Sequence, residues 1–105
     1  MLNWYKNLYI GHSIEKKYRK IRRKIEAGAG ITGAYLITLA VNPENQLEII
    51  SANFLLQKPV KRNCPMIVGL AGSYEEATEM VCSLAEQVYR ETGGLQIRRY
   101  ITDRT

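Results

Sequence analysis

Histidine and cysteine are scarce in this chain, which holds one histidine, His12, and two cysteines, Cys64 and Cys82. A closed zinc site needs about four such ligands held close together, so the sequence predicts no metal site. Two cysteines are too few for a disulfide framework and are most simply interpreted as free thiols. The glycine-rich stretch at residues 69–73 lacks the Walker signature and the full dinucleotide fingerprint, and glutamates follow it. We therefore interpret it as a structural turn and expect no cofactor.

Long apolar runs are absent as well. No stretch of about 20 consecutive apolar residues occurs, and the pattern of a secretory signal peptide is missing. Apolar residues make up 46% of the chain and charged residues 24%, as in ordinary globular domains. A length of 105 residues suits one domain. We expect a single domain over residues 1–105, in a soluble cytoplasmic protein that has no membrane partner.

The clearest local pattern begins with residues 66–71, a short apolar run typical of a buried strand. Ser73 and Glu76 follow at the spacing of a capping box, in which each side chain bonds the backbone N–H of the other residue. Apolar side chains then recur at steps of three and four as far as Val88. Gly93 supplies the left-handed residue that stops many helices. These features predict a long amphipathic helix after a buried strand.

Residues 95–102 are rich in β-favouring types and are predicted as the last strand. A strand, helix and strand in this order predict a right-handed parallel crossover between residues 66–71 and 95–102. Arg98 and Arg99 interrupt the apolar alternation, and we favour an edge strand that is blunted by charge. The alternative is a site that, with Tyr100, stacks on a base or contacts a phosphate.

Two further strands are predicted for residues 32–41 and 47–56. The first is apolar on both faces, which is typical of a central strand. Residues 42–46, with a proline at position 43, are predicted as the turn of a hairpin between them. Residues 57–65 contain two prolines and are predicted as a loop.

Together these elements predict a domain of the α+β class. We expect a two-layer α/β sandwich with the order α-β-β-β-α-β, in which a four-stranded mixed sheet carries two helices. The domain divides into an aromatic N-terminal segment (residues 1–12), a basic helix (13–27), and the sheet with the long helix (32–102). The basic helix is expected on the same face of the sheet as the long helix, or across an end. Folds of this kind serve many functions, so the fold class predicts none.

Positive charge is concentrated in one segment. Residues 13–26 hold seven basic and two acidic residues, and eight of each remain in the rest of the chain. The whole formal net charge of +5 therefore lies in this segment. An apolar seam at steps of four, three and four is expected to attach the helix to the sheet. Its members are Ile14, Tyr18, Ile21 and Ile25.

Such a density of cations favours a polyanionic partner, with nucleic acid as the leading hypothesis. Like charges stand at i,i+4 along the helix, and a phosphate-rich partner would relieve their repulsion. The alternative is a solvated helix face that only aids solubility. The predicted anion-binding residues are Lys16, Lys17, Arg19, Lys20, Arg22, Arg23 and Lys24, with Lys58, Lys61 and Arg62 in support if the two segments are neighbours.

Two other functions stay open. Trp4, Tyr5 and Tyr9 either pack onto the domain, which we favour, or form an exposed patch for a protein partner or a second copy. Cys64 follows basic residues that favour the thiolate, and His12 is the one imidazole that could serve it as a base. A small ligand-binding or thiol-dependent enzyme is therefore the third hypothesis, although we expect a protein that is not an enzyme.

Overall fold

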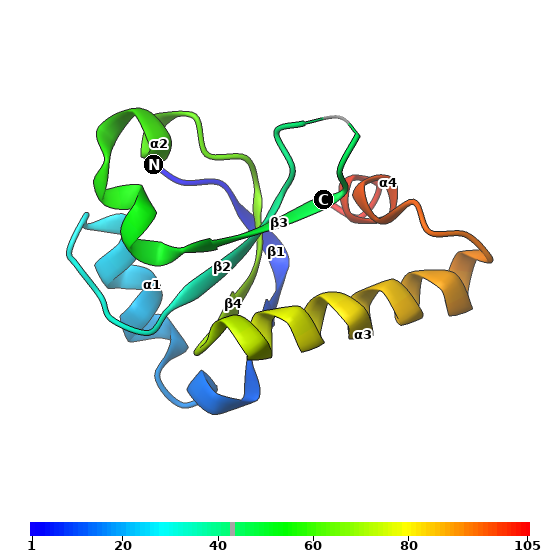
Figure 1. The fold of residues 1–105 in the computed structure, drawn as a ribbon, viewed down its shortest axis with the longest axis horizontal. Coiled ribbons are helices and arrows are strands. Elements are labelled where there is room, and N and C mark those ends of the chain that lie inside the picture. The colour runs from blue at the N-terminus through cyan, green and yellow to red at the C-terminus, as the bar shows by residue number, and fades with distance from the viewer. Residues whose placement is uncertain (43) are drawn as a thin grey trace.

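The computed structural model describes residues 1–42 and 44–105 and shows an α+β fold around a four-stranded mixed sheet (Figure 1). The strands are β1 (Trp4–Ile10), β2 (Tyr35–Leu39), β3 (Leu47–Ser51) and β4 (Ile67–Ala71), and they lie in the order β1-β4-β2-β3. β1 runs parallel to β4, whereas the other two pairs are antiparallel. The predicted α+β class and the four-stranded mixed sheet are confirmed.

The helical elements are η1 (His12–Ile14), α1 (Tyr18–Glu26), η2 (Ala52–Leu56), α2 (Lys58–Arg62), α3 (Tyr74–Thr92) and α4 (Ile97–Thr102), where η marks a 3-10 helix. Within residues 1–42 and 44–105, none of the helices has both the length and the apolar character that a membrane span requires.

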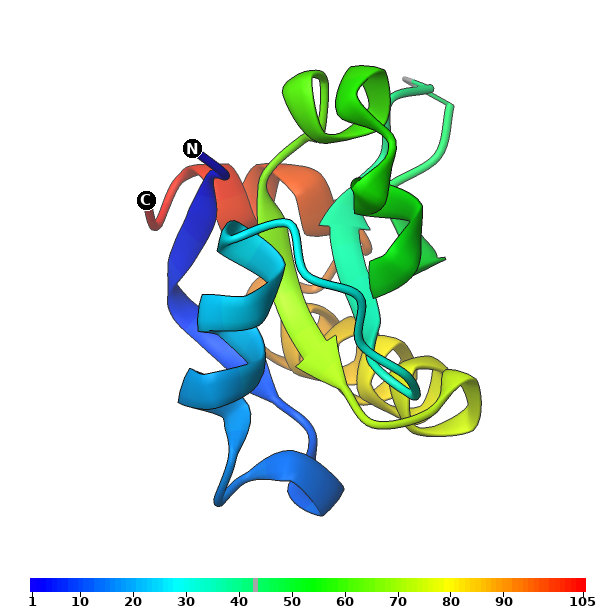
Figure 2. The ribbon, with the colours of Figure 1, turned by 90° about the vertical axis from the view of Figure 1, so that its left-hand side faces the viewer.

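Helices cover both faces of the sheet, so the molecule has three layers (Figure 2). α1 and η2 pack on one face and α3 and α4 on the other. The cause lies in the central strands: Leu36 and Leu70 face α1, while Ile37 and Val68 face α3. A sheet that is apolar on both faces needs cover on both. The two-layer arrangement, with the basic helix on the face of the long helix, is therefore wrong.

The predicted C-terminal strand is also wrong, because residues 97–102 form the helix α4. Ile97, Tyr100 and Ile101 are buried together, and this spacing suits one turn of a helix. The guanidinium of Arg98 donates to the carbonyls of Ala40 at 2.6 Å and Asn45 at 3.1 Å, which ties α4 to the connection between β2 and β3. The element order α-β-β-β-α-β and its crossover therefore do not occur.

The fourth strand comes instead from the N-terminal segment. β1 pairs with β4 in parallel, with Trp4 opposite Ile67 and Ile10 opposite Leu70. The register shifts between these pairs, so the middle of β1 departs from regular pairing at the edge of the sheet. The expectation that residues 1–12 pack onto the domain is confirmed, since Tyr5 is only 2% exposed.

The predicted strand over residues 47–56 ends early, at Ser51. Its hydroxyl accepts a hydrogen bond from the backbone N–H of Asn53, which turns the chain into η2. The predicted loop over residues 57–65 contains the short helix α2. The turn predicted at residues 42–46 includes Pro43, which lies outside the described residues.

The long helix α3 is confirmed at both ends. The Ser73 hydroxyl accepts a hydrogen bond from the Glu76 backbone N–H at 3.0 Å, and Gly93 ends the helix in the left-handed conformation with φ of +77°. Its apolar stripe packs Ala77, Leu84 and Val88 against the sheet. The capping box differs in its second half, because the Glu76 carboxylate bonds other groups than the N–H of Ser73.

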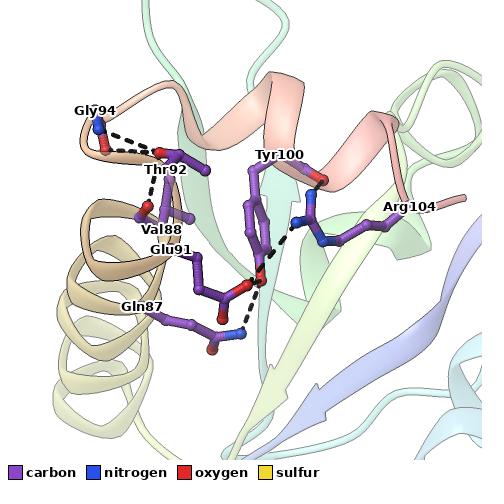
Figure 3. Close-up of polar contacts among 7 residues, drawn as sticks. All are labelled: Gln87, Val88, Glu91, Thr92, Gly94, Tyr100 and Arg104. Atoms are coloured by element: carbon purple, nitrogen blue, oxygen red, sulfur yellow. Dashed lines mark hydrogen bonds and ion pairs between the residues drawn. The ribbon is translucent and has the colours of Figure 1, made fainter.

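A polar network joins α4 to α3, as Figure 3 shows. The Tyr100 hydroxyl donates to the Glu91 carboxylate at 2.8 Å and accepts from the Gln87 amide at 3.0 Å. The Arg104 guanidinium covers the Tyr100 ring at 3.5 Å and lies 3.8 Å from the Glu91 carboxylate. The ring, its hydroxyl and one cation thus hold the C-terminal helix in place.

Replacing Tyr100 with phenylalanine removes the hydroxyl that joins Gln87 and Glu91. We expect the free energy of unfolding, measured by urea denaturation, to fall by about 1 to 2 kcal/mol. Tyr89→Phe is the control, because Tyr89 lies on α3, between Gln87 and Glu91, and is 60% exposed. Its effect should stay within about 0.5 kcal/mol. Equal losses in the two variants would contradict the role of this network.

Candidate nucleic-acid interface

The apolar seam of the basic segment is seated as predicted. Ile14, Ile21 and Ile25 are 3 to 6% exposed and Tyr18 is half-buried, all within the core on the α1 face. The helix itself is shorter than residues 13–27, because α1 begins at Tyr18 and residues 12–14 form η1. The Ser13 hydroxyl donates to the distant Glu76 carboxylate, and no side chain caps the start of α1. The seam therefore directs the rest of the helix surface to solvent.

Six of the seven cations of this segment are exposed: Lys16, Lys17, Arg19, Lys20, Arg23 and Lys24. The seventh, Arg22, is half-buried, and its guanidinium lies 4.6 Å from the centre of the Trp4 ring. Such a cation–π contact stabilises the junction of α1 with β1. Arg22 is therefore placed by the fold, whereas the other six cations face solvent.

The acidic neighbours of these cations are engaged elsewhere. Glu15 pairs with His12 at 3.2 Å. Glu26 accepts hydrogen bonds from the Leu2 backbone N–H and the Trp4 indole N–H, each at 3.1 Å. Throughout the part of the chain that the structure describes, no ion pair involves a cation of α1 or of residues 16 and 17. The positive charge of this surface is thus largely uncompensated.

Two hollows flank the ridge that Lys17 and Lys20 form on this surface. The first, which we call the lysine groove, has a volume of about 500 Å³. The second, the outer hollow, has a volume of about 420 Å³. One side of the lysine groove is lined by Ser13 and Ile14 of η1, by Lys17 just before α1, and by Lys20, Ile21 and Lys24 of α1. The other side is lined by residues 31–34 and Gly72. The outer hollow is lined by Glu15, Lys16, Lys17, Tyr18, Arg19, Lys20 and Arg23.

The supporting cations of α2 lie at the C-terminal end of α1. The Lys61 amine donates to the Glu26 carbonyl at 2.6 Å, which satisfies one of the carbonyls left free where a helix ends. Lys58 and Arg62 are exposed on the same short helix. The two basic segments are therefore neighbours, as the supporting assignment required, and Lys61 also has a structural role.

The Glu76 carboxylate joins Ser13 and Gly72, two residues that line the lysine groove. It accepts hydrogen bonds from the Gly72 backbone N–H at 2.7 Å, the Ser13 N–H at 3.0 Å and the Ser13 hydroxyl at 2.7 Å. A Cβ at Gly72 would overlap the Ser13 hydroxyl, and a Cβ at Gly11 would overlap the Glu76 carboxylate. Both glycines are thus required for the close approach of the two segments. The Gly72 N–H is occupied, as expected for a structural turn.

The three aromatic residues of the N-terminal segment do not form one exposed patch. Trp4 packs on the α1 face of the sheet, whereas Tyr5 and Tyr9 pack on the α3 face. Tyr5 lies in the core, and its ring stacks with that of Tyr9 at 6.2 Å. Trp4 and Tyr9 remain half-buried. The structure therefore separates the residues of this predicted interaction site.

Cys64 and His12 lie at opposite ends of the sheet. Cys64 precedes β4, and His12 follows β1 just after Gly11, whose N–H donates to Leu70 at the far end of β4. Burial raises the pKa of the Cys64 thiol, which disfavours the thiolate that the basic loop was expected to stabilise. Across the described residues, no three His, Cys, Asp or Glu side chains are placed to hold a metal ion.

The far wall of the lysine groove, at residues 31–34, was missed by the sequence analysis. These residues carry no signal of their own for binding, and only the fold brings them opposite α1. Comparisons with protein-family models, with curated proteins and with solved structures find no match for this chain.

We expect Glu76→Gln to lower the free energy of unfolding at neutral pH by about 1 to 3 kcal/mol. Burial raises the pKa of Glu76, but the hydrogen bonds from Gly72 and Ser13 outweigh burial and bring this pKa below its ordinary value of 4.5. A carboxyl group whose pKa is lowered by folding stabilises the folded state at pH values above its ordinary pKa. This stabilisation is lost as the pH falls through the pKa that the group has in the folded state. The difference from wild type should therefore shrink below about pH 4.

Urea denaturation across pH measures this effect. Glu79→Gln is the matched control, since Glu79 is exposed one turn away on α3, where its carboxylate makes no hydrogen bond to any described residue. A difference between wild type and Glu76→Gln that did not change with pH would contradict the proposed role of the charge.

The exposure of the two thiols predicts their order of reaction. Cys82 is exposed on α3, whereas Cys64 is half-buried and donates its S–H to the Pro65 carbonyl at 3.3 Å. We expect limited alkylation near neutral pH, read by mass spectrometry, to modify Cys82 first. Faster modification of Cys64 would revive the thiol-enzyme hypothesis.

Proposed function

We propose that this protein binds nucleic acid through the phosphate backbone, using α1 and the cations beside it. The observation that carries the proposal is the set of six exposed cations within residues 16–24, held by a buried isoleucine seam and without an ion-pair partner among the described residues. Phosphate contacts by lysine and arginine supply most of the affinity of non-specific nucleic-acid binding. The function proposed is a binding function, without catalysis.

Electrostatic repulsion within α1 supports this proposal. Within α1, Lys20 and Lys24, and Arg19 and Arg23, stand four residues apart, and each such pair costs a few tenths of a kcal/mol in an isolated helix. A polyanion would remove this cost and release its own counterions. Surface charge that only aids solubility needs no such density on one helix face.

The competing hypotheses have less support. An aromatic interaction patch would need Trp4, Tyr5 and Tyr9 on one surface, and they lie on two faces of the sheet. A thiol enzyme would need Cys64 near His12, and they lie at opposite ends of β4. The two free thiols suit a reducing compartment, so the same proposal has the protein act in the cytoplasm.

Fluorescence anisotropy with labelled DNA and RNA, titrated across salt, tests the proposal. We expect the logarithm of the binding constant to fall linearly with the logarithm of the salt concentration. The slope should grow by about 0.7 to 0.9 for each phosphate contacted. The double variant Lys20→Glu, Arg23→Glu should bind at least about tenfold more weakly at low salt, because two contacts become repulsive. Absence of binding by wild type at low salt, where surface charges act most strongly, would refute the proposal.

The matched control is Arg90→Glu, Arg99→Glu, which changes the net charge by the same amount. Both arginines are exposed on α3 and α4, across the sheet from α1. This variant should keep affinity within about twofold of wild type if the interface is local. Equal losses in the two variants would show that only the net charge matters. Thermal unfolding by circular dichroism checks that each variant is folded.

A further inference from the structure

We propose that the lysine groove receives the sugar–phosphate backbone of a single-stranded nucleic acid, with the bases turned outward. This inference rests on the proposed function and names the form of nucleic acid that the interface prefers. It concerns one side of α1, the side that the fold turns into a groove, and leaves the outer hollow as a secondary surface.

The first support is the row of amines along one wall. Lys20 and Lys24 stand four residues apart and project from the same side of α1, and Lys17, at the N-cap just before α1, lines the groove with them. At 1.5 Å per residue the row is about 10 Å long. One strand of a duplex carries a phosphate about every 3.4 Å of helix axis, so about 10 Å corresponds to three such steps, or about four successive phosphates. A line of amines at this spacing suits a linear chain of phosphates.

The second support is the character of the opposite wall. Thr32 and Ala34 present small side chains there, and Gly33 and Gly72 present none. Gly33 has φ of +78°, a conformation that favours glycine, so this position of the wall carries no side chain. The nearby Glu76 carboxylate is charged, but it is not among the residues that line the groove. A phosphate chain can therefore approach the backbone opposite the lysines.

The walls of the two hollows, rather than their volumes, distinguish a single strand from a duplex. The lysine groove lies between the basic segment and a facing chain segment, so a single backbone can enter between two walls where a double helix is too wide. The outer hollow, of similar volume, is lined by residues between 15 and 23 alone and offers no facing wall. A duplex would instead touch the convex side of α1, where Lys16, Arg19 and Arg23 surround the outer hollow. We therefore expect single-stranded nucleic acid to bind in the lysine groove and a duplex to bind at the outer hollow.

The residues that line the groove also predict that the protein does not distinguish one nucleotide sequence from another. Among the described residues that line the lysine groove there is no aromatic ring on which a base could stack. Contacts to phosphates position a protein but carry no direct sequence information. We therefore expect binding that is independent of base sequence and that does not need the bases at all.

The test uses three labelled ligands: an oligothymidylate of about 12 nucleotides, its abasic counterpart of equal length, and a duplex of that length. Lys24→Gln alters the groove alone, and Arg23→Gln alters the outer hollow alone, with the same loss of charge at the adjacent position. We expect Lys24→Gln to weaken single-strand binding about threefold to tenfold and to lower its salt slope by about 0.7. Arg23→Gln should change single-strand binding by less than about twofold.

A third variant, Thr32→Leu, narrows the groove at an exposed position, leaves the charge unchanged and adds no aromatic ring. We expect it to weaken single-strand binding more than duplex binding, while the abasic ligand binds wild type about as well as oligothymidylate does. Equal effects of Lys24→Gln and Arg23→Gln, with none from Thr32→Leu, would overturn the groove assignment and leave polyanion binding standing. Absence of any binding by wild type would instead refute the proposed function itself.

Discussion

The arrangement of the basic surface depends on one carboxylate. Glu76 lies at the start of α3, yet its three hydrogen bonds go to Gly72, at the end of β4, and to Ser13, at the turn that follows β1. One side chain therefore joins both parallel strands to the helix on the α3 face of the sheet. Because Ser13 lies in η1, which leads into α1, these bonds also fix the chain just before the basic helix. The first turn of α3 thus positions a helix on the opposite face.

Much of the fold can be predicted from local sequence patterns. The elements that cannot be predicted in this way depend on contacts between residues that are distant in the chain. The ends of α3 follow from Ser73 and Gly93, which act within their own turns. Residues 97–102 suit either a strand or a turn of helix, and the choice is made by partners far away in the chain. Arg98 bonds carbonyls beyond β2, and Tyr100 bonds the end of α3. Short apolar segments are ambiguous for this reason.

The same division holds for the candidate site. The cations of α1 and the isoleucine seam beneath them could be predicted, since both follow from one helical period. The sequence could not predict which cations share a groove, because the far wall of that groove belongs to residues 31–34 and to Gly72. Nor could the sequence tell that Arg22 lies over Trp4 while its neighbours stay free for solvent. Composition thus indicates a basic surface, and only the fold divides it.

The parallel pairing of β1 with β4 has a consequence for the order of folding. Ser13 and Glu76 are separated by 63 positions in the chain, and β1 has its only partner among the described strands in β4. Synthesis proceeds from the N-terminus, so β1 and α1 emerge long before the strand and the carboxylate that seat them. During synthesis the isoleucine side chains of the basic helix therefore stay without the cover of β4 until that strand has emerged. Contacts of such long range are also the ones that slow folding.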